Sequence, residues 1–152
     1  MRHYLSRISI SLLTFGLMGL TAVPVPAATR PFHLVEHGTL VPGPNGTIIA
    51  NGSGNATHLG HITVERTLTL TPTSNPSEVD VDGEATLIAP GGDQLKTGVK
   101  GILNPATGRA TLVYEWEGGT GRFADATGVA VWLVQVNPDQ TFDVVADGII
   151  DY

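Results

Sequence analysis

The chain of 152 residues contains no cysteine and few basic residues. Without cysteine there is no disulfide, no thiol nucleophile and no thiolate metal site. Eight Lys and Arg stand against 14 Asp and Glu, which gives a formal net charge of −6. Nucleic-acid binding depends on clustered basic side chains that displace counterions, and the sequence has no such cluster. We therefore expect no nucleic-acid partner.

The sequence also has no run of apolar residues long enough to make a stable membrane span in the mature protein. An uncharged apolar segment, residues 8–23, follows Arg2 and Arg7, and small residues follow it up to Ala28. This order is typical of a secretory signal peptide, and the segment is shorter than the ~20 residues of a spanning helix. We predict a cleaved signal peptide at residues 1–28 and one domain at residues 29–152, secreted or periplasmic.

Helical periodicity is missing from the mature chain, and alternation of apolar with polar residues takes its place. The alternation is clear in residues 61–71, 78–89, 109–116 and 141–152, as in strands that bury one face. Residues 129–136 are apolar on both faces, which predicts a central or covered strand. Turn-forming Gly, Pro and Asn separate these segments at hairpin spacing. We predict an all-β domain of about seven or eight antiparallel strands, a barrel or a sandwich.

The Gly-rich stretch GGTGRFADATG, residues 118–128, is the most distinctive motif. It lacks the lysine and the strand-to-helix context of a phosphate loop. It resembles the Gly-Gly-Thr/Ser-Gly-x-Phe-x-x-Ala-x-Gly signature of dirigent proteins and allene oxide cyclases. The resemblance implies an eight-stranded antiparallel, calycin-like β-barrel whose apolar interior holds a small hydrophobic molecule without a cofactor. Where dirigent proteins carry an arginine shortly after this unit begins, the chain has Ala124. A structural role is also open, in which Phe123 plugs one barrel end.

Arg66 occupies a place in the apolar register of residues 61–71, so we expect it to point into the barrel. A buried arginine needs a carboxylate partner, and Glu115 and Asp125 are the candidates. The alternative is that Gly60 forms a bulge, which would shift the register and place Arg66 on the surface.

The residues that we expect near a ligand pocket combine one histidine, one ion pair and the large aromatics. Aromatic side chains also fill cores, so their presence alone does not establish a binding site. Pairs of histidines at positions 33 and 37 and at 58 and 61 are poorly spaced for one metal ion on a strand, and we expect no metal site. The pocket candidates are His58, Arg66, Tyr114, Glu115, Trp116, Phe123 and Trp132.

No nucleophile–base motif, phosphate loop or His-Glu-x-x-His sequence is present, so no catalytic residue is assigned. The first hypothesis is an exported small barrel that binds a small apolar molecule. An alternative is a cofactor-free isomerase or cyclase, which would need inward-facing ionisable groups among Arg66, Glu115 and His58. A third is a structural or outer-membrane-associated β-protein. A homo-oligomer is compatible with each hypothesis.

Overall fold

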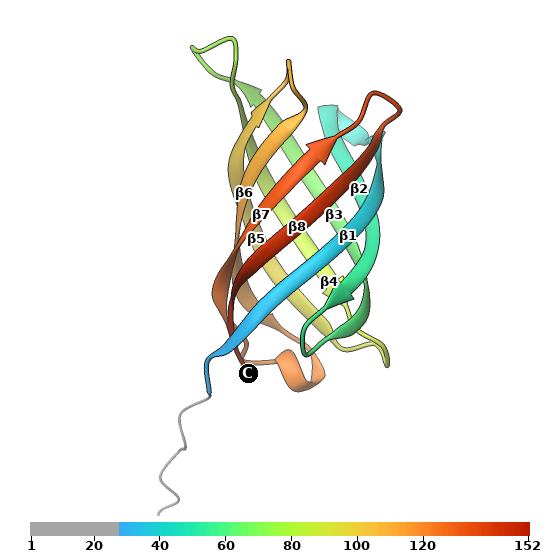
Figure 1. The fold of residues 1–152 in the computed structure, drawn as a ribbon, viewed down its shortest axis with the longest axis vertical. Helices are drawn as coiled ribbons and strands as arrows, with labels where there is room; N and C mark the ends of the chain where they lie inside the picture. Colours follow the sequence, from blue (N-terminus) through green and yellow to red (C-terminus); the bar gives the residue numbers. More distant parts are fainter. Residues whose placement is uncertain (1–27) are drawn as a thin grey trace, which may run out of the picture.

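The computed structural model describes residues 28–152, which form a closed barrel of eight antiparallel strands (Figure 1). Neighbouring strands in the sequence are neighbours in the barrel, and β1 also pairs with β8 to close it. The prediction of an all-β, eight-stranded antiparallel barrel is confirmed. The predicted signal peptide lies outside the described residues, except for Ala28. The strands are β1 (Arg30–Pro42), β2 (Thr47–Ala56), β3 (Gly60–Pro72), β4 (Val79–Ile88), β5 (Gln94–Asn104), β6 (Arg109–Gly119), β7 (Thr127–Val136) and β8 (Thr141–Asp151).

Alternation of side chains along each strand separates the interior of the barrel from its outer surface. In β3 the buried residues run from Ile62 to Leu68 at every second position, and the threonines and Glu65 between them are exposed. In β6 the same pattern buries Tyr114 and Trp116. The period-2 pattern of the sequence therefore marks the inward face correctly, because successive side chains of a strand point to opposite sides.

The lower end of the barrel in Figure 1 is closed by the Gly-rich stretch. It forms the connection between β6 and β7 and contains the short 3-10 helix η2 (Gly121–Phe123). Phe123 is fully buried and packs edge-on against Tyr152, with ring centroids 5.0 Å apart. Gly118 has a φ of 78°, and a Cβ there would lie 2.6 Å from the carbonyl oxygen of Ala124. Position 118 therefore requires glycine. The motif reverses the chain between β6 and β7, and Phe123 plugs this end of the barrel as predicted.

The upper end of the barrel in Figure 1 is formed by the connections β1–β2, β3–β4, β5–β6 and β7–β8. The first of them contains the 3-10 helix η1 (Pro44–Gly46). None of these connections sends a large buried side chain into the barrel as Phe123 does at the other end. The two ends of the barrel are therefore different, and a cavity lies inside the upper one.

The outer face of β7 is not covered in the part of the chain that the structure describes. Residues 129–136 form a strand that is paired on both sides, but the side chain of Leu133 is 59% exposed. The prediction of a central or covered strand is met by the central position of β7, and its outer face has no cover within residues 28–152. Other exposed apolar residues of β7 and of β6, β8 and β1 extend this surface: Val129, Val131, Val113, Val145, Ile149 and Val35.

Candidate functional site

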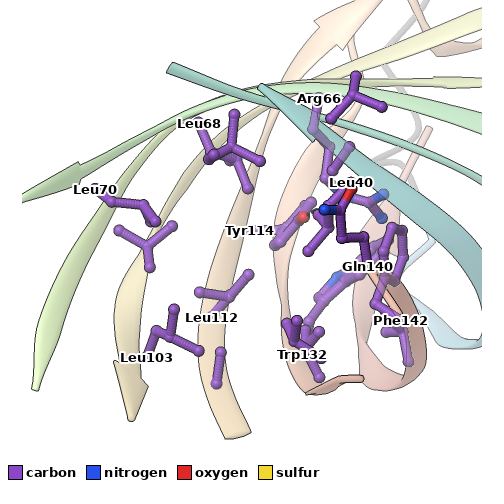
Figure 2. A pocket seen from close by; sticks show the side chains of 18 of the residues that line it. Leu40, Arg66, Leu68, Leu70, Leu103, Leu112, Tyr114, Trp132, Gln140 and Phe142 are labelled. Atoms are coloured by element: carbon purple, nitrogen blue, oxygen red, sulfur yellow. Dashed lines mark hydrogen bonds between the residues drawn. The ribbon is translucent and has the colours of Figure 1, made fainter. Parts of the chain in front are cut away.

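A cavity of about 340 Å³ lies inside the upper end of the barrel. Its walls are formed by aliphatic and aromatic side chains from all eight strands, and Gln140 in the β7–β8 connection also lines it. Figure 2 shows Arg66, Tyr114, Trp132 and Phe142 gathered on one side of the cavity. The opposite side carries leucines from β3, β5 and β6: Leu68, Leu70, Leu103 and Leu112.

A buried cluster of polar side chains forms the base of this cavity. Arg66 on β3 donates from Nη1 and Nη2 to the two carboxylate oxygens of Glu36 on β1, at 2.8 and 2.6 Å. Its Nε donates to the hydroxyl of Tyr114 on β6 at 2.6 Å. Glu36 and Arg66 are 0% and 4% exposed. The bidentate geometry uses both carboxylate oxygens and joins β3 to β1 past the intervening β2, while the bond to Tyr114 reaches β6 on the far side of the barrel.

Aromatic rings surround the guanidinium of Arg66. The ring of Tyr114 stacks on that of Trp132, with centroids 4.0 Å apart and planes 9° apart. The guanidinium carbon lies 4.9 Å from the Trp132 centroid and 5.4 Å from the Phe142 centroid. Cation–π contacts of this kind stabilise a desolvated guanidinium, so the cluster holds Arg66 by charge, hydrogen bonds and packing together.

The carboxylate of Glu36 fits because β2 has no side chain at position 52. A Cβ on Gly52 would lie 2.0 Å from the Oε1 atom of Glu36. Glycine at position 52 thus leaves the space beside β1 that the Glu36 carboxylate needs to reach Arg66. Any larger residue at this position would displace the carboxylate from the guanidinium.

Burial disfavours the charged forms of both Arg66 and Tyr114, whereas the contact between these two side chains favours them. Burial works against the charge of Arg66, but Tyr114 and Glu36 outweigh it, so the pKa of the guanidinium lies above its ordinary value. Burial also raises the pKa of the Tyr114 phenol, although the charge of Arg66 opposes that rise. Arg66 is therefore a cation and Tyr114 a neutral phenol throughout the physiological range.

One buried side-chain donor of this cluster has no hydrogen-bond partner within residues 28–152. The indole nitrogen of Trp132 is buried without a partner. The oxygen of Tyr114 accepts from Arg66, and none of the hydrogen bonds in the described chain uses the hydroxyl as a donor. Buried polar groups nearly always have at least one partner in native proteins, so the indole of Trp132 is an exception and the hydroxyl of Tyr114 is not.

The structure brings three of the seven pocket candidates together at the cavity: Arg66, Tyr114 and Trp132. Trp116 and Phe123 are buried near the closed end, where the indole of Trp116 donates to the carbonyl of Ile149 at 2.9 Å. His58 and Glu115 are exposed, in the β2–β3 turn and on the outer face of β6.

The predicted partner of Arg66 is wrong, because Glu36 and neither Glu115 nor Asp125 accepts from it. The alternative that a bulge at Gly60 places Arg66 on the surface is also wrong. Pairing of β2 with β3 runs without a register shift through Gly60, and Arg66 stays on the inward face.

Sequence reasoning missed Glu36, Gln140 and Phe142. The signal for Glu36 was present, because it continues the inward alternation of Phe32 and Leu34 along β1. Phe142 lies in a segment with a clear strand pattern, but nothing in that pattern says that its ring would face the guanidinium of Arg66.

No group of three or more His, Asp or Glu side chains within residues 28–152 is arranged to hold a metal ion. In the same part of the chain, no helix is both long and apolar enough to cross a membrane. Comparison with family models, with curated proteins and with solved structures gave no match to the chain.

Proposed function

We propose that this protein is an exported barrel that binds a small apolar molecule in the cavity at its upper end. The observation that carries the proposal is a cavity of about 340 Å³ with apolar walls and a single polar cluster at its base. Ligand sites are typically concave and mostly apolar, with a few polar groups that orient the ligand.

The size of the cavity favours a small ligand. Pockets for small molecules commonly measure ~300–1,000 Å³, and this one lies near the lower limit. Each Å² of apolar ligand surface removed from water contributes about 25 cal/mol, so an apolar chain gains affinity along the whole leucine-rich wall. No cofactor is needed for this kind of binding.

Two substitutions on neighbouring positions of β6 test the proposal. Ala110 lines the cavity, and Thr111 points to the outer surface. We expect Ala110→Phe to fill the cavity and to weaken binding of the neutral fluorescent probe N-phenylnaphthylamine at least about tenfold, the equivalent of ~1.4 kcal/mol. Thr111→Phe adds the same ring outside and should leave binding unchanged. Equal binding by both variants and the unaltered protein would place the probe on the surface and refute the proposal.

We propose kinship with the allene oxide cyclase and dirigent barrels on the basis of the Gly-rich motif. The support is that the motif residues form the closed barrel end, with Phe123 as its plug, in a barrel of the expected strand number. The proposed export is tested separately, by N-terminal sequencing of the protein recovered from its source. A mature chain that begins near Ala28 is expected, and a chain that retains Met1 in a soluble cytoplasmic fraction would contradict export.

A second candidate function is a cofactor-free isomerase or cyclase that uses the same cavity. It is favoured by one observation, that ionisable groups point inward at the cavity base. His58 and Glu115 are exposed, so the roles would fall to Arg66 and Tyr114. The test is to identify the molecule that co-purifies with the protein and to incubate it with unaltered protein and with Tyr114→Phe. Conversion of this molecule into an isomer of the same mass, at a lower rate with the variant, would support catalysis. If the molecule is unchanged, ligand binding is the only function supported.

A further inference from the structure

We infer that Gln140 binds the polar end of an uncharged amphipathic ligand at the mouth of the cavity, while the apolar part of the ligand fills the cavity below it. The ligand class that fits is a single-chain alcohol or primary amide. The inference rests on the proposed function, because it specifies the ligand class of the same cavity. Its support comes from the free side-chain amide of Gln140, from the backbone conformation of this residue and from the charges around the mouth.

Gln140 carries the exposed polar side chain of the cavity wall. Among the residues that line the cavity in the described chain, the other polar groups belong to Arg66, Tyr114 and Trp132, which are all buried. Gln140 lies in the β7–β8 connection at the upper end, and Figure 2 shows its side chain turned in toward the other lining residues. Its hydrogen bonds within residues 28–152 involve only its backbone, so the side-chain amide is available both as a donor and as an acceptor.

The backbone of Gln140 has a conformation that glycine would adopt at a lower cost. Its φ is 66°, in the left-handed region that disfavours residues with a Cβ. The β1–β2 and β5–β6 connections at the same end place glycine immediately before the next strand, and Gly46 and Gly108 have φ values of 78° and 69°. The carbonyls of Gly108 and Gln140 accept in the same way from the backbone N–H groups of Val136 and Leu40, at 2.7 and 2.8 Å. The β7–β8 connection thus carries a strained glutamine where two others carry glycine, and strain of this kind is concentrated at functional sites.

The charges around the mouth favour an uncharged partner for this amide. Asp139 precedes Gln140, and hydrogen bonds from Thr141 hold the pKa of its carboxyl below the ordinary value, so it is an anion at neutral pH. The other charged residue of the four upper connections is Glu78, and Arg109, at the start of β6, is on the outer face. A ligand carboxylate at the mouth would therefore lie near acidic side chains without a cation to pair with, whereas a hydroxyl or an amide can exchange hydrogen bonds with Gln140.

The interior below the mouth offers no comparable partner for the polar end of the ligand. Arg66, Tyr114 and Trp132 are at most 5% exposed, and each nitrogen of the Arg66 guanidinium already donates to Glu36 or to Tyr114. The other lining side chains apart from Gln140 are apolar. The ligand therefore enters with its apolar end first and leaves its polar end beside Gln140.

Substitution of Gln140 by methionine tests the amide, because methionine keeps the length of the side chain and removes the hydrogen-bonding atoms. Affinities of 1-nonanol, nonane and nonanoate are measured by displacement of N-phenylnaphthylamine at pH 8. We expect Gln140→Met to bind 1-nonanol about threefold to tenfold more weakly than the unaltered protein does, the effect of one hydrogen bond, with nonane affinity little changed. On the unaltered protein, nonanoate should bind more weakly than 1-nonanol. An unchanged affinity for 1-nonanol, an equal loss for 1-nonanol and nonane, or tighter binding of nonanoate than of 1-nonanol would overturn the inference.

Substitution by glycine separates a binding role of the side chain from a structural one. Gln140→Gly should raise the Tm by about 1–4 °C, because glycine adopts the positive φ without strain, and it should weaken 1-nonanol binding as Gln140→Met does. His58→Gly is the matched control, because His58 has a φ of 65° but lies in the β2–β3 turn at the closed end. It should raise the Tm similarly and leave the affinities unchanged. A fall in the Tm of Gln140→Gly but not of His58→Gly would assign the side chain a structural role and overturn the inference.

The outcomes separate the two proposals. If 1-nonanol and nonane bind but both Gln140 variants keep the affinities of the unaltered protein, the inference is overturned and the apolar cavity remains the binding site. Failure of all three probes to displace the fluorophore would overturn the proposed function itself. Near-ultraviolet circular dichroism identifies a variant that has not folded, and in that case the other Gln140 variant decides the inference.

Discussion

Replacement of Arg66 by methionine should lower the free energy of unfolding at pH 8 by about 3–5 kcal/mol. Methionine retains the length and apolar stem of the side chain but removes the two bonds of 2.8 and 2.6 Å to Glu36. Because Glu36 is 0% exposed, water cannot replace the lost partner. For a domain of this size the loss corresponds to about 10–20 °C in Tm. Urea unfolding followed by tryptophan fluorescence measures it.

A second substitution distinguishes a lost ion pair from poor packing. If the cost arises from the unpaired carboxylate, Glu36→Met in the Arg66→Met background should recover most of the stability.

The reasoning would be refuted by a loss below about 1 kcal/mol for Arg66→Met, the range of solvent-exposed ion pairs. It would also fail if the double variant lost the sum of the two single losses, because groups in direct contact should not act independently.

Three further outcomes follow from the same structure. Gly52→Ala should cost about 1–3 kcal/mol in urea unfolding, because its Cβ would lie 2.0 Å from an oxygen of Glu36; an unchanged midpoint would mean that the carboxylate has room to move. Burial raises the pKa of Tyr114 in the folded protein. The neutral phenol therefore stabilises the folded state at neutral pH, and this contribution is lost above the ordinary tyrosine pKa of ~10. Stability should therefore fall more steeply from pH 9 to 11 in the unaltered protein than in Tyr114→Phe; parallel curves would contradict the shift. Phe123→Ala should cost about 3–5 kcal/mol by thermal or urea unfolding, and unaltered probe affinity is expected because Phe123 lies at the closed end; a comparable loss of affinity would argue against separate roles for the two ends.

The fold could be predicted because its main determinant is local. Alternation along β3 identifies the inward face without knowledge of any other strand, and it places Arg66 inside. The same pattern already placed Glu115 outside, on the opposite face from Tyr114, so its candidacy as a partner of Arg66 conflicted with the alternation. The exposed position of Glu115 confirms that the alternation was the better guide.

The site could be predicted only in part, because it depends on which inward residues meet across the barrel. Glu36 and Arg66 are on strands separated by β2, and Tyr114 comes from β6. Their contact requires the register of several strand pairs and the space that Gly52 leaves. The cavity is likewise a property of packed volumes, since the bulky Phe123 of the β6–β7 connection fills the closed end, and the connections at the upper end send no buried side chain inward. No window of sequence carries that information.

The pairing of β1 with β8 has a consequence for the order of folding. Arg30 at the start of β1 pairs opposite Ile150 near the end of β8, so β1 lacks one of its two partners until the last strand has been synthesised. Contacts between such distant parts of a chain form slowly, because the loop between them must first be closed. Until then β1 and β7 present open strand edges, which readily pair with other chains. A chain shortened within β8 should therefore aggregate rather than form a smaller barrel.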